Sequence, residues 1–276
     1  MSKGWFVTGS SRGFGRVWVE AALDRGDRVV ATARDAAALT GLERDYPGQI
    51  HVMDLDVTDR EAAFDVIGRA QRFLKTIDVV VNNAGYGLFG MVEEISEEQA
   101  RAQFETNVFG ALWVTQAVLP IMRAQGSGHI IQVSSIGGVH AFPGLGLYNA
   151  SKWALEGFSQ ALAAEVADFG IRVTLVEPTG YATDWAFTSA IRVEGLPAYD
   201  AFREAALAAR AKVIADRGDP LATAPVMLEL VDMPNPPLRL FLGEGPHDMI
   251  KAEYAKRLAE WEQFDALSRS AHRLPG

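Results

Sequence analysis

A tyrosine and a lysine four residues apart are the residues of this sequence with the clearest capacity for chemistry. In Tyr148-Asn149-Ala150-Ser151-Lys152, a helix places the phenol and the ammonium one turn apart on the same face. Free tyrosine titrates near ~10, so a phenol that exchanges protons near neutral pH needs its pKa lowered by roughly 3 units. One positive charge ~4 Å away, at an effective dielectric of ~20, contributes about 4 kcal/mol, which is enough. The pair predicts an acid/base site, although an isolated pair of this kind is more often an ordinary amphipathic helix with a surface lysine.

The elements that must position this pair alternate between strand and helix. Helical periodicity covers residues 14–25, 60–74, 97–123 and 147–169. Short apolar, β-branched runs that are typical of buried parallel strands lie at residues 5–8, 29–33, 50–53, 79–81, 130–133, 173–176 and 238–242. The alternation predicts a doubly wound parallel α/β sheet in three layers, α/β/α, within a single domain spanning residues 1–276. Ligands of such sheets bind beyond the carboxyl ends of the strands.

Composition excludes several classes of function. The net charge of −9 argues against a nucleic acid or an anionic membrane as a partner. The absence of cysteine excludes disulfides, a thiol nucleophile and cysteine-ligated metals. No apolar run approaches the ~20 residues of a membrane span. We expect no metal site, because the five histidines show no ligand spacing, and we expect a cytoplasmic protein.

A glycine-rich turn follows the first apolar run. The segment Thr8-Gly9-Ser10-Ser11-Arg12-Gly13-Phe14-Gly15 precedes a predicted helix and has the spacing TGxxxGxG. Glycines at a helix N-terminus let backbone N–H groups approach a pyrophosphate, where the helix dipole favours negative charge. The alternative is a tight turn without a ligand, but its place after the first strand favours a dinucleotide site.

The residues after the second strand bear on which dinucleotide is bound. An acid at this point usually binds the ribose 2′-hydroxyl, but this chain has Ala33-Arg34-Asp35. Arg34 and Arg12 could hold a 2′-phosphate through charge-assisted hydrogen bonds. Asp35 is either a displaced ribose acid or, as we favour, the N-cap of the next helix. We therefore predict NADP(H), with NAD(H) as the less favoured cofactor.

Polar segments also follow the next three strands. Asp54-Leu55-Asp56-Val57 offers carboxylates that either bind an adenine amino group or cap the next helix. Asn82-Asn83-Ala84-Gly85 is either a polar turn or part of the same site. Ser134 and Ser135 come after the fifth strand, upstream of Tyr148.

In its ordered combination of TGxxxGxG, NNAG, a serine upstream of the tyrosine, and YxxxK, the chain resembles the short-chain dehydrogenase/reductase family of Rossmann-fold enzymes. The resemblance covers residues 3–183, with a weaker echo at residues 238–242. It implies that Tyr148 is the catalytic acid/base, that Lys152 lowers its pKa and holds the nicotinamide ribose, that Ser135 steadies the substrate oxygen, and that Asn107 positions a water. It also implies a set of cofactor-binding residues: Gly9, Ser11, Arg12, Gly13, Phe14, Gly15, Arg34, Asp56, Val57, Asn83, Ala84, Gly85, Tyr148, Lys152, Pro178, Gly180 and Thr183.

One position departs from the family pattern. The family commonly has Pro-Gly after the sixth strand, whereas this chain has Pro178-Thr179-Gly180. A threonine reaches unusual φ/ψ angles less readily than glycine, so the nicotinamide end of the site is the least secure part of the resemblance. Thr183 still matches the family threonine.

Residues 179–219 form a long insertion between the last two strands, which we interpret as a substrate lid rather than an extra packing layer. It contains no clear strand and carries Tyr181, Trp185, Phe187, Ile191, Leu196, Tyr199 and Phe202 among helix formers. These aromatics favour an apolar substrate or else pack the lid onto the sheet. His140, between Ser135 and Tyr148, is a further candidate for substrate contact.

The sequence thus predicts an NADP(H)-dependent oxidoreductase that interconverts a carbonyl compound (a ketone or an aldehyde) and an alcohol. The alternatives are a dinucleotide-sensing or scaffold protein without catalysis and a different chemistry on the same fold. The resemblance also implies a homodimer or homotetramer, formed through the helices at residues 97–123 and 147–169.

Overall fold

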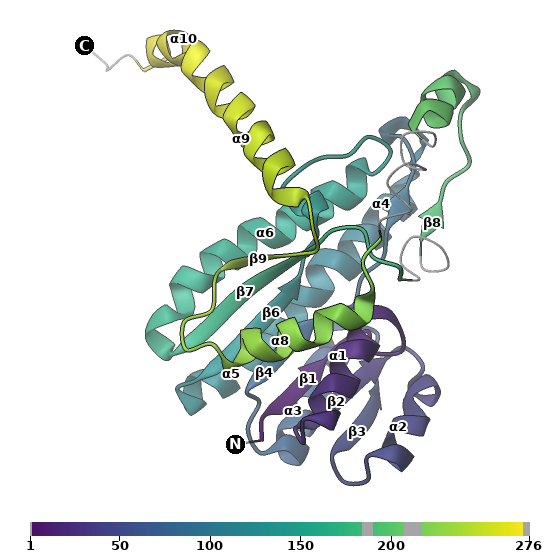
Figure 1. Ribbon diagram of the computed structural model, residues 1–276, viewed down its shortest axis with the longest axis vertical. Coiled ribbons are helices and arrows are strands. Elements are labelled where there is room, and N and C mark those ends of the chain that lie inside the picture. Colours follow the sequence, from purple (N-terminus) through teal and green to yellow (C-terminus); the bar gives the residue numbers. More distant parts are fainter. Residues whose placement is uncertain (1, 184–189, 207–216, 273–276) are drawn as a thin grey trace.

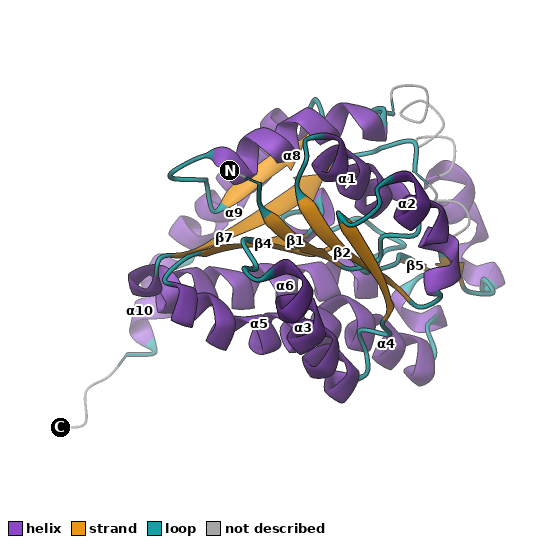
Figure 2. Cartoon of the chain, turned by 90° about the horizontal axis from the view of Figure 1, so that it is seen from below, coloured by secondary structure: helices purple, strands orange, loops and turns teal. Residues whose placement is uncertain are grey.

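Seven parallel strands form the central sheet, in the order β3-β2-β1-β4-β6-β7-β9 (Figures 1 and 2). The computed structural model describes residues 2–183, 190–206 and 217–272. The strands are β1 (Gly4–Val7), β2 (Arg28–Ala33), β3 (Ile50–Asp54), β4 (Val79–Asn82), β6 (Gly128–Val133), β7 (Ile171–Pro178) and β9 (Arg239–Leu242). Each apolar run of the sequence overlaps one of them, which confirms the predicted sheet.

Helices cover both faces of the sheet, as Figure 2 shows from below. One face carries α1 (Gly13–Asp24), α2 (Thr40–Asp45) and α8 (Thr223–Asp232), and the other carries α3 (Arg60–Leu74), α5 (Ala111–Gln125) and α6 (Gly146–Val166). Each face has its own buried apolar cluster; Trp18 and Leu230 belong to the first, and Ile67 and Leu162 to the second. The predicted single-domain, three-layer Rossmann-type fold is therefore confirmed.

The sheet order creates a crevice at its centre. Strand β1 pairs with β2 on one side and with β4 on the other, so the chain winds outward in opposite directions from this point. Loops that leave the carboxyl ends of β1 and β4 therefore diverge, and the space between them is where open α/β sheets bind ligands.

The helix predicted at residues 97–123 is interrupted, which corrects the sequence interpretation. A regular helix, α4 (Glu97–Phe104), begins at the N-cap Ser96 and is followed by a π-helical turn, Glu105–Gly110, before α5. A Cβ on Gly110 would lie 2.6 Å from Cγ2 of Val57, so the turn packs closely on the loop after β3. Periodicity alone does not reveal such a turn, because it adds a single residue to a continuous helix.

The expectation of an insertion without strands is also wrong. Strand β8 (Ile191–Arg192) lies within it and pairs in parallel with β5 (Leu88–Phe89), which follows β4. Further along, Pro197–Tyr199 form a 3₁₀ turn and residues 200–206 are helical. Trp185 and Phe187 lie outside the described residues.

The chain ends in two helices that the sequence interpretation did not include. Helix α9 (Pro246–Gln263) leaves the body after β9 and leads to α10 (Asp265–Ser270) at the far end of the molecule (Figure 1). Among the described residues, we find no helix with both the length and the apolar character needed to cross a bilayer.

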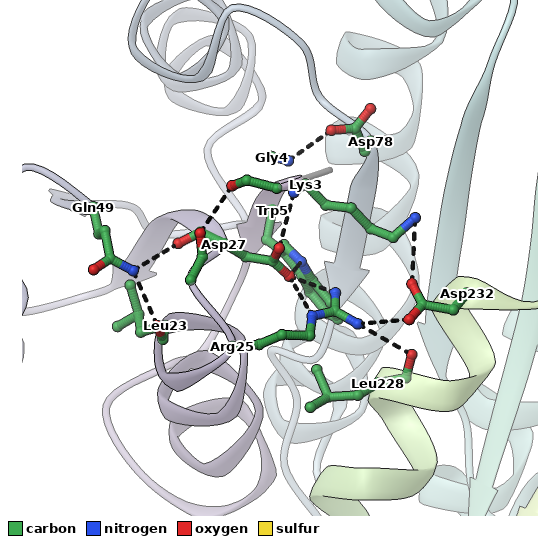
Figure 3. Close-up of polar contacts among 12 residues, drawn as sticks. Lys3, Gly4, Trp5, Leu23, Arg25, Asp27, Gln49, Asp78, Leu228 and Asp232 are labelled. Carbon is green, nitrogen blue, oxygen red and sulfur yellow. Dashed lines mark hydrogen bonds and ion pairs between the residues drawn. The ribbon is translucent and has the colours of Figure 1, made fainter.

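A cluster around Asp27 closes the amino ends of the strands (Figure 3). The buried carboxylate accepts hydrogen bonds from the Lys3 backbone N–H at 2.9 Å, Trp5 Nε1 at 2.8 Å and Arg25 Nε at 2.9 Å. Arg25 also donates to Asp232 on α8 at 3.0 Å. The cluster thereby joins β1, α1 and α8 at the end of the sheet opposite the crevice.

We expect Asp27→Ala to lower the free energy of unfolding by about 3 kcal/mol, because it leaves buried donors, one of them charged, without an acceptor. Urea denaturation followed by tryptophan fluorescence measures this loss. Asp45→Ala is the matched control, since its ion pair with Arg44 is exposed and contributes at most ~1 kcal/mol. Equal losses in the two variants would contradict a role for the buried cluster.

Candidate functional site

A cavity of about 540 Å³ occupies the crevice at the carboxyl ends of the strands. It extends from the glycine loop after β1 to the tyrosine and lysine of α6. Most of the residues predicted for the site line it: Gly9, Ser11, Arg12, Gly13, Phe14, Arg34, Asp56, Val57, Asn83, Ala84, Gly85, Ser135, Tyr148, Lys152, Pro178 and Thr183. Gly15, Asn107 and Gly180 do not line it and lie behind or beside its walls.

The glycine loop and the Asn-Asn-Ala-Gly segment are bound to each other. The hydroxyl of Thr8 accepts hydrogen bonds from the backbone N–H groups of Asn83 and Ala84, both at 3.0 Å. In return, the side-chain amide of Asn83 donates to the carbonyls of Thr8 at 3.0 Å and Gly9 at 2.9 Å. The loops after β1 and β4 therefore form one unit.

Two glycines of the loop have a clear steric requirement. Gly9 has a φ of +65°, and a Cβ there would lie 2.9 Å from Cα of Ala84. A Cβ on Gly15 would lie 2.5 Å from both Nδ2 of Asn83 and the carbonyl oxygen of Gly9. The backbone after β1 thus packs tightly at the start of α1, as a phosphate cradle at a helix N-terminus requires.

The outer end of the cavity is positively charged. Arg12 and Arg34 are both exposed and both line the cavity. Asp35 is the N-cap of the 3₁₀ turn Ala36–Leu39 and accepts from the N–H of Ala37 at 3.0 Å, which confirms the cap interpretation over a displaced ribose acid.

Asp56 remains available to the cavity. Its carboxylate accepts from the N–H and the hydroxyl of Thr58, at 3.0 and 2.8 Å, in a local turn. The N-cap of α3 is Asp59, whose carboxylate accepts from the N–H of Ala62. The alternative that Asp54 or Asp56 caps this helix is therefore not what the structure shows.

Tyr148, Ser135 and Lys152 meet at the inner end of the cavity. Helix α6 places Tyr148 and Lys152 one turn apart, and their residues are 5% and 6% exposed. The ammonium lies 5.9 Å from the centre of the phenol ring and donates to the carbonyl of Val133 at 2.8 Å. The hydroxyl of Ser135 accepts from the N–H of Gly137 at 3.0 Å and hydrogen-bonds Tyr148.

Burial dominates the charge states of this pair. It raises the pKa of Tyr148 to about 12, with only partial opposition from the hydrogen bond to Ser135. It lowers the pKa of Lys152 to about 8, against the attraction of Glu156. In the protein alone the pKa of Tyr148 is therefore raised, contrary to the lowering expected from the lysine charge. The reason is that burial removes water from the phenolate and so disfavours it.

Asn107 lies in the π-helical turn, behind Lys152. Its side chain exchanges hydrogen bonds with the backbone of Tyr86, at 3.1 Å each, and donates to the hydroxyl of Ser151 at 3.1 Å. A Cβ on Gly85 would lie 3.0 Å from Oδ1 of Asn107 and 3.6 Å from Nζ of Lys152. Asn107 thus fixes the segment after β4 against the catalytic helix; its predicted role in positioning water stays a prediction.

Thr179 takes the place of the family glycine without strain. Among the described non-glycine residues, Lys75 alone has a positive φ, so the backbone of Thr179 lies in an ordinary region. The space that its side chain needs comes from Gly243, where a Cβ would lie 2.1 Å from Oγ1 of Thr179. Thr179 lines the cavity beside Pro178 and Thr183.

Several lining residues were not anticipated from the sequence. Tyr86 follows the Asn-Asn-Ala-Gly segment, and burial raises the pKa of its phenol. Tyr181 and Ile191 belong to the insertion and also line the cavity, so the insertion forms part of its wall. His140 packs edge-on against Phe142, with ring centres 4.7 Å apart, and is not among the lining residues.

Known proteins of similar sequence and fold are oxidoreductases. Residues 3–190 match the sequence profile of the family described as short chain dehydrogenase. The chain is 41% identical over 266 residues to oxidoreductase BOA17 of Botryotinia fuckeliana (strain B05.10), with 94% of each chain covered. A crystal structure of a short-chain dehydrogenase from Streptomyces avermitilis is 39% identical, has a TM-score of 0.90 and covers 98% of both chains. The closed form of a serine dehydrogenase complexed with NADP+ is 25% identical, with a TM-score of 0.73, and covers 87% of this chain and 94% of that one.

We expect Thr8→Val, which keeps the shape of the side chain, to lower the free energy of unfolding by about 2 kcal/mol, since the N–H of Ala84 loses its acceptor and the N–H of Asn83 keeps only the carbonyl of Val81. Chemical denaturation measures the loss. Thr40→Val is the control, because the hydroxyl of Thr40 bonds a local carbonyl at an exposed site. An unchanged stability of Thr8→Val would show that the two loops do not depend on this hydroxyl.

Proposed function

This chain belongs to the short-chain dehydrogenase family, and we propose that it is an NADP(H)-dependent oxidoreductase that interconverts a carbonyl compound and the corresponding alcohol. The observation that carries the proposal is the placement of Tyr148, Ser135 and Lys152 at one end of a cavity that contains the glycine loop and two arginines at the other. A dinucleotide in this cavity would have its phosphates at the glycine loop and its reactive end at the acid/base pair.

Each catalytic side chain has a distinct role in this proposal. The hydroxyl groups of Tyr148 and Ser135 bind the substrate oxygen, and Tyr148 gives that oxygen its proton in reduction or removes it in oxidation. The protonation states of Lys152 and Tyr148 depend on their burial and on neighbouring charges. An added positive charge at the inner end of the cavity therefore favours the phenolate form of Tyr148. The cofactor supplies or accepts the hydride, and the protein supplies geometry and charge.

The charge at the outer end of the cavity supports NADP(H) over NAD(H). Arg34 stands at the end of β2 where an acid would favour an unphosphorylated ribose, and Asp35 is engaged as an N-cap. Arg12 approaches from the glycine loop. Two guanidinium groups and no free acid at this position suit a 2′-phosphate.

The insertion after β7 supports an apolar substrate under a lid. Its base is closed by a bridge between Tyr181 and Gly218, and Tyr199 bonds Glu93 of the body at 2.6 Å. An apolar cluster surrounds the buried Tyr148 and includes Ala190 of the insertion; its other members are Phe89, Phe142 and Leu145. A substrate that reaches Tyr148 through this cluster would present an apolar group to it.

A sensing or scaffold protein on the same fold is the rival from another class. It has no need for an acid/base tyrosine that bonds a serine, with a buried lysine one turn away, and this chain has all three. Assembly into a homodimer or homotetramer through the helices at residues 97–123 and 147–169, and a cytoplasmic location, stay predictions from the sequence.

We expect Tyr148→Phe to lower kcat/KM by about 10²- to 10⁴-fold, the typical contribution of a positioned proton donor. The assay is NADPH oxidation with a panel of ketones and aldehydes. Tyr46→Phe, which removes an exposed phenol bonded to Asp24 far from the cavity, is the control. Equal turnover by Tyr148→Phe and the wild type would overturn the mechanism.

We expect Arg34→Ala to weaken NADPH binding by about 10- to 100-fold while leaving NADH binding nearly unchanged, because the charge-assisted bonds go to the 2′-phosphate. Calorimetric titration with both dinucleotides measures the difference. Arg44→Ala, at an exposed position on α2, is the control. A parallel loss for NADPH and NADH would exclude Arg34 as the residue that distinguishes them.

A further inference from the structure

Two buried glutamates lie behind the catalytic end of α6. Glu156 follows Lys152 by one helical turn, and Glu177 lies near the carboxyl end of β7; their exposed fractions are 5% and 0%. Both carboxyl groups approach one nitrogen: Nε of Arg239 on β9 lies 2.9 Å from Glu156 and 3.6 Å from Glu177. Helix α6 and strands β7 and β9 lie side by side in Figure 1, so three elements contribute to the cluster.

The two carboxyl groups share one cation. Oε1 of Glu156 and both oxygens of Glu177 have no hydrogen-bond donor, although they are buried. One guanidinium cannot balance two buried carboxylates, and a proton on one of them both removes a charge and supplies a donor. Burial, followed by the negative charge of Glu156, raises the pKa of Glu177 to about 8. Glu177 therefore binds a proton more readily than an ordinary glutamate does.

Glu156 is the member of the pair nearer to the cavity. A Cβ on Gly138 would lie 2.6 Å from Oγ of Ser134 and 3.3 Å from Oε1 of Glu156, so these two oxygens gather around one glycine. Ser134 also lines the cavity. Glu156 thus lies behind the part of the cavity wall that Ser134 forms.

We propose that Glu156 is a positioning residue that keeps the ammonium of Lys152 charged, and that Arg239 and Glu177 hold the carboxyl group of Glu156 in place. Around Lys152, α6 contributes Tyr148 and Glu156, β6 contributes the neutral carbonyl of Val133, and the π-helical turn contributes the neutral amide of Asn107.

Farther out, two more cations face Glu156 and its helix. Arg239 of β9 bonds Glu156 and also Gln160, and Arg257 of α9 lies over the ring of Trp153, 5.0 Å from its centre. Neither cation stabilises a charge on Lys152. Because burial alone lowers the pKa of Lys152, the carboxylate of Glu156 is the group that opposes that loss of charge.

The catalytic role of a charged Lys152 rests on the proposed function, but the charge of Lys152 does not. The test therefore measures the protonation of Lys152 directly. Full-length protein is treated with acetic anhydride at a series of pH values, and acetylation of Lys152 is quantified by mass spectrometry of its peptide. The exposed Lys251 on α9 is the internal reference. The midpoint of reactivity reports the protonation of Lys152 whether or not any substrate is turned over.

Glu156→Gln and Glu177→Gln form the matched pair, since each converts one carboxyl of the same cluster into an amide. We expect Glu156→Gln to lower the midpoint of Lys152 by about one pH unit. Glu177→Gln should lower it less, because Glu156 lies one turn from Lys152 on the same helix whereas Glu177 lies on β7. Glu165→Gln, at an exposed position of α6, should leave the midpoint in place.

An unchanged midpoint in Glu156→Gln, or equal lowering in both members of the pair, would overturn the proposal. If Glu156→Gln does not fold, as judged by its thermal transition, Glu156→Met takes its place with the same expected shift. A shifted midpoint together with an absence of carbonyl reductase activity in the wild type would uphold this inference and contradict the proposed function instead.

Discussion

The site depends on the hydrogen bonds that join the loops after β1 and β4. At the centre of a doubly wound sheet these loops must diverge to open a crevice, yet their partly buried backbone groups need hydrogen-bond partners. Thr8 resolves this conflict, because its hydroxyl accepts from two backbone N–H groups of the neighbouring loop. Asn83 completes the exchange with two bonds in return. The glycine loop is therefore held open by its neighbour, independently of any bound phosphate.

From this junction the constraints extend to the catalytic helix. The segment that begins at Asn83 continues to Gly85 and Tyr86, whose backbone is held by Asn107 in the π-helical turn. Asn107 in turn bonds Ser151, one residue before Lys152. A chain of contacts thus runs from the glycine loop after β1 to the helix that carries Tyr148 and Lys152. The extra residue of the π turn is what lets Asn107 point toward this segment while α4 and α5 keep their packing.

Sequence patterns anticipated the parts of the molecule that are repetitive or chemically unusual. Buried parallel strands are continuous apolar runs, and a glycine loop followed by a helix has few competing interpretations. Two-residue strands such as β5 and β8 have no periodicity to detect. Helix α9 carries exposed aromatic residues, including Trp261 at 64%, and so lacks the apolar stripe by which surface helices are recognised. The charges behind the site were missed for another reason: Glu156, Glu177 and Arg239 are far apart in the sequence and meet only in the folded chain.

Thr179 and Gly243 show that the structural effect of a departure from a family pattern depends on residues far away in the sequence. A threonine in place of a glycine at the nicotinamide end suggests strain or a blocked site when only its neighbours in sequence are considered. In the structure, the loss of a glycine at 179 is matched by a glycine at 243, whose φ of +100° and missing Cβ make room for the threonine side chain. The hydroxyl of Thr179 consequently packs toward the loop after β9, and its backbone N–H continues the sheet by donating to the carbonyl of Leu242 at 3.0 Å. The cavity wall at this point therefore depends on both positions, because a side chain at 243 would collide with Thr179.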